Sequence, residues 1–356
     1  MTSTTSPASQ PADYIEQAQR RLPDMLADIE RVISIETPSH DKKAVAAGAQ
    51  DFAALLKDRL GAEAELLEID GTTHVRLRFG TGPARVVLLN HQDTVWPHGT
   101  LDRIPFSTED GILRGPGSFD MLTGAIMSVH ATAIVADHLG EGGLDGLSIL
   151  VTGDEEIASL TSSELIRAEA AEAKAVFVME ASADGALKLE RKGTSNYVLK
   201  FTGKASHAGL EPEKGINAGM ALALTLPLVA DLADAEAGTT VVPTVISAGT
   251  TSNTVPAEAR VDIDVRARTA AELERVDAQI RELAVNPQVE GSTTEVLGGI
   301  NRPPFEKEQS AALFDRATAL AGELGLPAPR GVSVGDRKST RLNSSHMPKS
   351  RMPSSA

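Results

Sequence analysis

Residues 147–156 read LSILVTGDEE, an apolar run of strand length that leads through a glycine into three acidic residues. Apolar runs also end in possible metal ligands in VVLLNHQD at 86–93 and in AVFVME at 175–180. Apolar runs of this length, alternating along the chain with helical patterns, are typical of a parallel or mixed sheet covered by helices. Because ligands bind outside the carboxyl ends of strands in such sheets, we expect the polar side chains at these ends to form one site.

The polar residues at these ends, and in RGPGSFD at 114–120, are possible ligands of a divalent metal. They are His91, Asp93, Asp120, Glu155, Glu156 and Glu180. Zinc accepts nitrogen from a neutral imidazole and oxygen from carboxylates. In the doublet Glu155-Glu156 one carboxylate can bind metal while its neighbour moves a proton, which indicates metal-assisted hydrolysis. The alternative is an ordinary acidic pair at a helix N-terminus, favoured by the helix dipole.

The composition excludes several classes of protein. With 34 Lys and Arg against 49 Asp and Glu, the net charge is −15, which argues against a nucleic-acid partner. The chain has no cysteine, so disulfides and thiolate ligands are excluded. The polar N-terminal segment does not resemble a secretory signal, and the apolar stretches are broken by charge or glycine before membrane-spanning length. We therefore expect a cytoplasmic protein without a membrane partner.

The pattern of apolar residues predicts an α/β chain with a second, α+β unit. We expect two helices between about Ala12 and Leu60. THVRLRF at 73–79 and ARVVLLNH at 84–91 are separated by the turn signal GTGP, which predicts a hairpin or neighbouring strands. The predicted domains are a disordered arm (1–12), a catalytic domain (13–192 and 305–336), a lid domain (193–304) and a disordered tail (337–356).

Six motifs occur in the order that one enzyme family shows. They are HQDTVWP (91–97), GPGSFDMLTG (115–124), GDEEIAS (153–159), ME (179–180), GKASHAG (203–209) and SNTVP (252–256). The chain therefore resembles the dinuclear zinc metallopeptidases that include acetylornithine deacetylase, succinyl-diaminopimelate desuccinylase and glutamate carboxypeptidase, and is most similar to the glutamate carboxypeptidase branch. The resemblance implies a catalytic domain with a mixed central sheet flanked by helices, and an inserted α+β lid through which two subunits form a homodimer.

The resemblance also implies roles for individual residues. His91 and Glu180 match ligands of one zinc, Glu156 matches a ligand of the second, and Asp120 matches the carboxylate that bridges them through a cis peptide bond to Met121. Glu155 matches the general base. The family's other groups fall on Asp93, which orients His91, on His207, which polarises the scissile carbonyl, and on the substrate-binding residues Asn253, Arg266 and Arg302. Two zinc ions per subunit are implied, with cobalt or manganese as possible substitutes.

The C-terminal region departs from the family pattern. The family has one more histidine there as a ligand of the second zinc, whereas here GVSVGD at 331–336 runs into a basic, serine-rich segment without acidic residues. His346 lies in NSSHMP, outside the family context, and we interpret it as not being the ligand. We interpret residues 337–356 as a non-native tail and hypothesise that the second metal site is impaired and this chain weakly active or inactive.

The function predicted from the sequence is zinc-dependent hydrolysis that releases a C-terminal amino acid, glutamate-like, from a small peptide or N-acyl amino acid. An arginine that binds the substrate carboxylate in bidentate fashion would explain carboxypeptidase specificity. The alternatives are an N-acyl amino acid deacylase or dipeptidase of the same family and, in another class, a catalytically impaired binding protein. The intact base Glu155 argues against the last of these.

Overall fold

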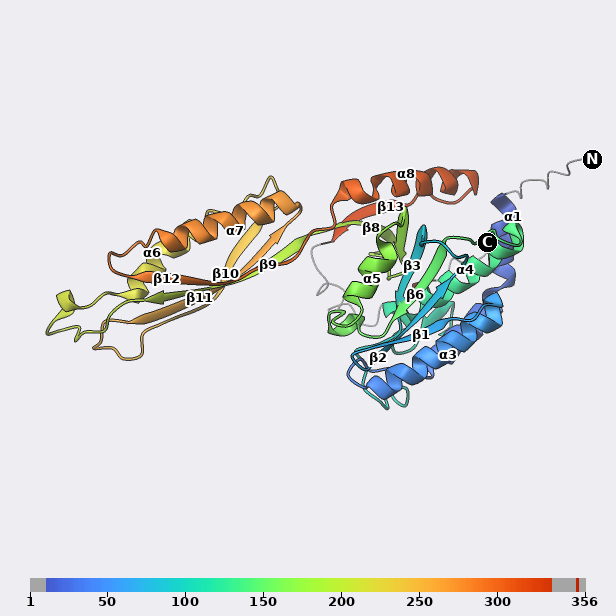
Figure 1. Ribbon diagram of the computed structural model, residues 1–356, viewed down its shortest axis with the longest axis horizontal. Helices are drawn as coiled ribbons and strands as arrows, with labels where there is room; N and C mark the ends of the chain where they lie inside the picture. The colour runs from blue at the N-terminus through green and yellow to red at the C-terminus, as the bar shows by residue number, and fades with distance from the viewer. Residues whose placement is uncertain (1–10, 335–349, 352–356) are drawn as a thin grey trace, which may run out of the picture. The chain divides into compact units, whose positions relative to one another are not determined.

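The computed structural model describes residues 11–334 and 350–351, and its contacts divide the chain into two units (Figure 1). The first contains residues 11–182, Leu320–Pro327 and 350–351, and the second contains Ala183–Ala319 and 328–334. The predicted arm lies mostly outside the described residues, as does the predicted tail apart from Ser350–Arg351, which form the short strand β14. His346 also lies outside the described residues.

The first unit is built on a five-stranded mixed sheet, as predicted. In spatial order its strands are β1 (Glu65–Ile69), β2 (Thr72–Arg78), β6 (Leu147–Thr152), β3 (Val86–His91) and β7 (Ala175–Val178). Strands β6, β3 and β7 are parallel, whereas β1 and β2 are antiparallel to their neighbours. The prediction that β2 and β3 form a hairpin or lie side by side is wrong, because β6 pairs with both and lies between them.

Helices cover both faces of this sheet. They are α1 (Pro11–Arg20), α2 (Leu22–Ile33), α3 (Lys42–Leu60), α4 (Thr123–Leu139) and α5 (Ser163–Ala170). Ile29, Phe52 and Val129 of α2, α3 and α4 share a buried core with one face of the sheet, and α5 packs through Leu165 against the other. Three helices precede the sheet where two were expected, because the chain breaks at Arg21, next to a proline in the first turn of α2.

Two local structures connect the first sheet to the candidate site. A hairpin of β4 (Ser107–Glu109) and β5 (Ile112–Arg114), joined by β14, precedes the π-helical turn η1 (Ser118–Leu122) and α4. A 3₁₀ turn, η2 (Glu155–Ile157), follows β6.

The span Ser118–Leu139 is long and apolar enough to cross a membrane, but much of it is buried in the core, as expected of a central helix in a globular unit.

The second unit contains an antiparallel four-stranded sheet with two helices on one face. The strands, in spatial order, are β10 (Thr240–Ala248), β11 (Glu258–Ala267), β9 (Gly193–Thr202) and β12 (Thr293–Arg302). Helices α6 (Ala218–Ala230) and α7 (Ala270–Val285) bury their apolar residues against it. The unit also contains the parallel pair β8 (Ala186–Arg191) and β13 (Arg330–Val334), the turn η3 (Pro212–Lys214) and most of α8 (Lys307–Glu323), whose residues from Leu320 on belong to the first unit. The predicted α/β class with an α+β second unit is confirmed.

Candidate metal centre

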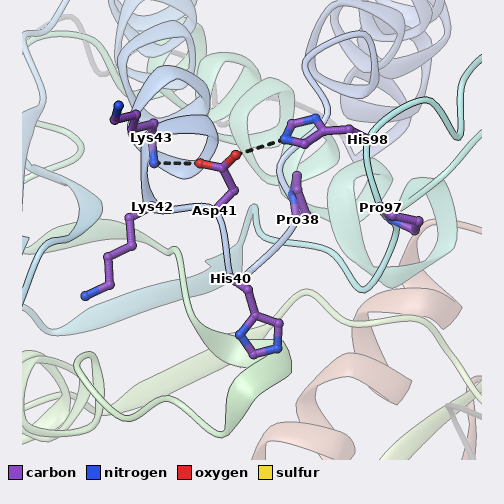
Figure 2. Close-up of a pocket in the computed structure, with 7 residues that line it drawn as sticks. All are labelled: Pro38, His40, Asp41, Lys42, Lys43, Pro97 and His98. Carbon is purple, nitrogen blue, oxygen red and sulfur yellow. Dashed lines mark hydrogen bonds and ion pairs between the residues drawn. The ribbon is translucent and has the colours of Figure 1, made fainter.

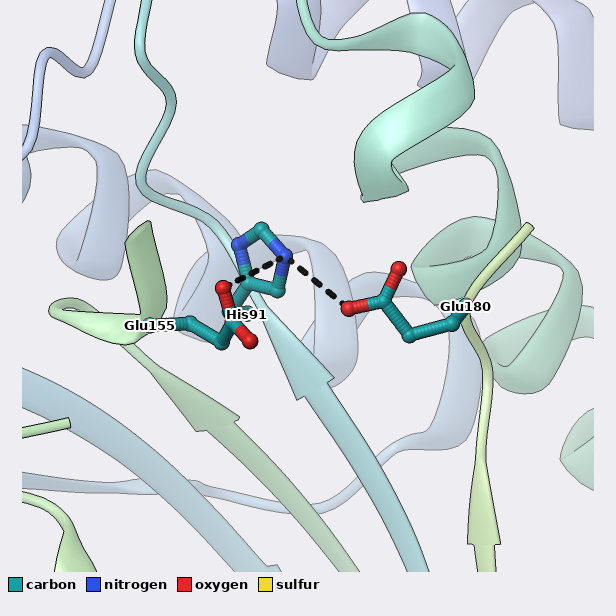
Figure 3. Close-up of side chains that lie close together, drawn as sticks. All are labelled: His91, Glu155 and Glu180. Carbon is teal, nitrogen blue, oxygen red and sulfur yellow. Dashed lines mark ion pairs between the residues drawn. The ribbon is translucent and has the colours of Figure 1, made fainter. Parts of the chain in front are cut away.

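The parallel strands β6, β3 and β7 bring three predicted ligands to one edge of the first sheet. His91 is the last residue of β3, Glu155 lies three residues beyond the end of β6, and Glu180 lies two residues beyond the end of β7. One possible ligand atom from each of these three side chains lies within 4.8 Å of the others, and Figure 3 shows the two carboxylates on either side of the imidazole. The arrangement follows from the parallel pairing, because the carboxyl ends of neighbouring parallel strands meet at the same edge.

The imidazole of His91 is surrounded by carboxylates. Its Nε2 atom lies 3.1 Å from Asp120 Oδ1, 3.5 Å from Glu180 Oε1 and 3.9 Å from Glu155 Oε2. The histidine side chain is 1% exposed, while the three carboxylate side chains are 22–25% exposed. The group is therefore rigidly held from the core side and open to a small molecule from the other side.

Asp120 reaches this group from the turn η1. Gly117 begins the turn with a φ of 71°, and a Cβ atom there would lie 2.7 Å from Cγ2 of Thr94, so only glycine fits. The peptide bond between Asp120 and Met121 is cis, which is the isomer that the resemblance implies. The glycines of the GPG segment thus allow the chain to turn beside β3 and present Asp120 to His91.

Asp93 holds both the histidine and the acidic doublet. His91 Nδ1 donates to the backbone oxygen of Asp93 at 2.9 Å, and the Asp93 carboxylate lies 3.5 Å from the same nitrogen. This contact fixes the tautomer that leaves Nε2 facing the three carboxylates. The Asp93 carboxylate also accepts hydrogen bonds from the backbone N–H groups of Glu155 at 3.0 Å and Glu156 at 3.1 Å, and from the hydroxyl of Ser39 at 2.6 Å.

The electrostatics of this group fit a bound cation. Burial acts to lower the pKa of His91, but hydrogen bonds to Asp120, Asp93 and Glu180 outweigh it and raise the pKa well above the ordinary value of 6.5. Without metal, the second proton on the imidazole partly balances the negative charge of the carboxylates. A divalent cation supplies more positive charge, and one imidazole nitrogen with carboxylate oxygens is a donor set that suits zinc, cobalt or manganese.

The structure brings Glu155, rather than Glu156, into the group with His91 and Glu180. Both glutamates belong to η2, and their backbone N–H groups share the Asp93 carboxylate. The assignment of Glu155 as base and Glu156 as ligand stays a prediction from the resemblance. Ser39 was missed by the sequence reasoning, since nothing in its local sequence reveals that it contacts Asp93.

The four predicted residues of the second unit fall into two places within that unit. His207 forms an isolated bridge with Thr254, and the carbonyl of Asn253 accepts the N–H of Ala208 at 2.9 Å, so the exposed side chains of His207 and Asn253 belong to paired loops. Arg266 of β11 and Arg302 of β12 both lie opposite Thr194 of the intervening strand β9. The two arginines therefore occupy one row across the sheet.

A surface pocket of about 520 Å³ lies beside the segment that precedes α3 (Figure 2). Its lining residues are Pro38, His40, Asp41, Lys42, Lys43, Pro97 and His98. His98 Nε2 lies 3.0 Å from Asp41 Oδ2, and Asp41 in turn caps α3 by accepting the N–H groups of Lys43 and Ala44. This supports a structural role for His98 in its loop, because it steadies the helix cap.

Comparison with known proteins supports the same family in both parts of the chain. Residues 189–292 match the peptidase dimerisation domain of the M20 peptidases. The chain is 29% identical to carboxypeptidase G2 of Pseudomonas sp. (strain RS-16) over 310 residues, which cover 85% of this chain and 74% of that protein. It is 25% identical over 250 residues to succinyl-diaminopimelate desuccinylase of Caulobacter vibrioides (strain NA1000 / CB15N), covering 62% of this chain but only 60% of the relative.

The fold has relatives among solved structures. The aminopeptidase PepT from Bacillus cereus superposes with a TM-score of 0.69 at 18% identity, with 91% of this chain and 87% of that chain covered. At this identity the likeness shows the fold alone. The sequence matches carry the relationship further, since they span the dimerisation domain and the segment with the grouped acidic residues, and they relate this chain to the M20 peptidases.

Proposed function

We propose that this M20 peptidase is a zinc-dependent hydrolase that releases a C-terminal, glutamate-like amino acid from a small peptide or N-acyl amino acid. The observation that carries the proposal is the group of His91, Asp120, Glu155 and Glu180 at the ends of the parallel strands. The similarity to carboxypeptidase G2 supports release of a C-terminal residue. A carboxylate-rich, partly exposed site around one buried imidazole has the chemistry of a metal-assisted hydrolase.

The side chains of this group divide the work of amide hydrolysis. His91, Asp120, Glu156 and Glu180 would hold the metal, which supplies Lewis acidity that makes water a better nucleophile at neutral pH. Glu155 accepts the proton of the attacking water and delivers it to the leaving amine. Its backbone N–H is tied to the buried Asp93, so its carboxylate starts from a fixed position beside Nε2 of His91.

The second unit supplies groups suited to a substrate carboxylate. Arg266 donates through Nε and a terminal nitrogen to the two oxygens of Asp264, each at 2.8 Å, which fixes the plane of its guanidinium. Arg302 stands in the same row beyond Thr194. A guanidinium held in this way can bind a carboxylate with two parallel hydrogen bonds, and this supports a substrate with a free C-terminus.

We also propose a homodimer formed through the edge strand β10 and helix α6. Val242, Val245 and Ile246 of β10 are 49–57% exposed, and Met220 and Leu224 of α6 are 50% and 47% exposed. An exposed edge strand with apolar side chains tends to pair with another chain. The match of this unit to a peptidase dimerisation domain supports a second copy as the partner.

The test of the catalytic proposal is a substrate panel with metal analysis. Purified protein loaded with zinc, cobalt or manganese is assayed with N-acyl glutamates, N-acyl ornithine and simple dipeptides, and the bound metal is counted. We expect glutamate release to be fastest. Faster cleavage of N-acyl ornithine or of dipeptides would favour the deacylase or dipeptidase alternative, and bound metal without turnover of any substrate would favour the binding protein.

The assignment of Glu155 as base has its own test. Glu155→Gln keeps the size of the side chain but cannot accept a proton, so we expect the rate of hydrolysis to fall about 10²- to 10⁴-fold. The matched control is Glu164→Gln, an exposed residue on α5, which should leave the rate unchanged. Hydrolysis by Glu155→Gln at the wild-type rate would contradict the proposed mechanism.

A further inference from the structure

The loop that carries the acidic doublet has an unfavourable backbone conformation. It runs from the end of β6 to the start of α5, and within it Ala158 has a φ of 78° and Ser159 a φ of 55°. Residues with a Cβ atom rarely adopt these left-handed values, and they persist only where the surrounding structure determines them. The groups that hold this loop therefore also determine where Glu155 and Glu156 lie.

Asp154 closes the loop from inside. Its side chain is buried, and its carboxylate accepts four hydrogen bonds: from the N–H and hydroxyl of Thr161 at 2.6 and 2.8 Å, and from the N–H and hydroxyl of Ser162 at 3.2 and 2.6 Å. Its backbone oxygen also accepts the N–H of Ser159 at 2.8 Å. Asp154 thus binds Ser159 in the middle of the loop, and Thr161 and Ser162 at its C-terminal end.

His74 of β2 extends this network behind the loop. Its ring is fully buried; Nδ1 accepts the N–H of Gly153 at 3.2 Å, so Nε2 carries the proton and donates to the hydroxyl of Thr161 at 3.1 Å. The Thr161 hydroxyl then donates to Asp154. The hydrogen bonds form one directed chain from Gly153 through His74 and Thr161 to Asp154, and each donor is used once.

We infer that Asp154, Thr161 and His74 are positioning residues that set the placement of Glu155 and Glu156 in the metal centre. Asp93 holds the backbone N–H groups of the doublet on one side, and this second network fixes the two ends of its loop on the other. The inference rests on the proposed function, because it assigns these residues to the placement of the proposed base.

The matched pair Thr161→Val and Thr161→Ser tests the chain of hydrogen bonds. Valine keeps the shape of threonine but removes the hydroxyl that links His74 to Asp154, whereas serine keeps the hydroxyl. At saturating metal we expect Thr161→Val to lower kcat about 10- to 100-fold with KM unchanged, and Thr161→Ser to stay within about twofold of wild type. Cobalt titration followed by visible absorption should show that Thr161→Val also lowers the affinity for cobalt about 10- to 100-fold. Thr161→Ser should not lower it.

Asp154→Ala and Asp154→Asn form a second pair, which tests the same network if Thr161→Val folds poorly. Asparagine can keep an oxygen toward the Thr161 and Ser162 N–H groups while its amide donates to the Ser162 hydroxyl, so it should retain more cobalt affinity and kcat than alanine. Wild-type kcat and cobalt affinity in both Thr161→Val and Asp154→Ala would overturn the inference. If Glu155→Gln is inactive in the same series, the proposed function stands while the inference fails; if Glu155→Gln is fully active, the proposed function fails.

Discussion

At the scale of single residues, buried histidines connect stability to pH. His130 of α4 lies 2.8 Å from Asp28 of α2, which also accepts two hydrogen bonds from Arg59 of α3. Burial lowers the pKa of His130 more than Asp28 raises it, and burial likewise lowers the pKa of His74. Both rings are therefore neutral in the folded protein at pH values where the unfolded chain begins to take up protons.

The sign of the pH dependence follows from these directions. Below the ordinary histidine pKa of 6.5, the unfolded chain binds protons that the folded protein does not. The free energy of unfolding should therefore decrease as the pH decreases, by up to about 1.4 kcal/mol per pH unit for each histidine. His91 has a raised pKa in the metal-free protein, so its contribution stays constant below 6.5 and is lost only as the pH rises through its folded pKa.

Urea unfolding of the metal-free protein between about pH 5 and 7 measures this dependence. His130→Gln, which can still donate to Asp28 but does not titrate, should show a shallower slope than wild type. A stability that is flat in this range, or that rises as the pH falls, would mean that these histidines are protonated in the fold.

The sequence predicted the residues whose role depends on position along a strand. His91, Glu155 and Glu180 follow apolar runs, and their convergence could be foreseen because parallel strands end at a common edge. The support from His74 and Ser39 could not, because each contacts residues far along the chain and its neighbours in sequence give no sign of the partner.

At the scale of elements, α5 is tied to the sheet by a buried carboxylate. Glu169 has a fully buried side chain and lies in a two-pronged ion pair with Arg78 of β2, with Arg76 at 3.6 Å. Because both arginines are partly exposed, we expect Glu169→Ala to lower the free energy of unfolding by about 1–3 kcal/mol. Chemical denaturation measures this loss.

The same helix offers a control. Glu164 pairs with Arg167 on the exposed side of α5, and Glu164→Ala should change the free energy of unfolding by no more than about 0.5 kcal/mol. An equal effect of the two substitutions would show that the buried pair adds nothing beyond a surface ion pair.

Which elements form was easier to predict than which elements pair. β6 and β7 were expected close to where they are found, because each has a clear apolar pattern. The insertion of β6 between β2 and β3 could not be read from the turn signal GTGP, since a turn fixes only the local chain direction. Strand β12 was not foreseen, because Gly298 and Gly299 interrupt its pattern, although the tight contact of Gly298 with Asn196 explains why glycine is needed.

At the scale of the whole molecule, the exposed edge of the second sheet predicts the oligomeric state. Ile246→Asp places a charge on β10 at a position that is 53% exposed in the single chain. If β10 pairs with a second copy, this charge would be buried at the interface and the dimer should dissociate at concentrations where the wild type remains associated.

Sedimentation velocity reads out this change. Leu297→Asp on β12, the opposite edge of the same sheet, is the matched control and should leave the association unchanged. Dissociation by Leu297→Asp but not by Ile246→Asp would place the interface at the other edge.

The strand order β6-β3-β7 has a further consequence for the life of the protein in a cell. Its grouped side chains come from segments far apart in sequence, so the unfolded chain presents no comparable site. A cation that binds only the folded form stabilises it by mass action, by about 2.7 kcal/mol when free metal exceeds Kd a hundredfold. Metal scarcity would then lower the abundance of the protein as well as its activity, because more of the chain would be open to proteases.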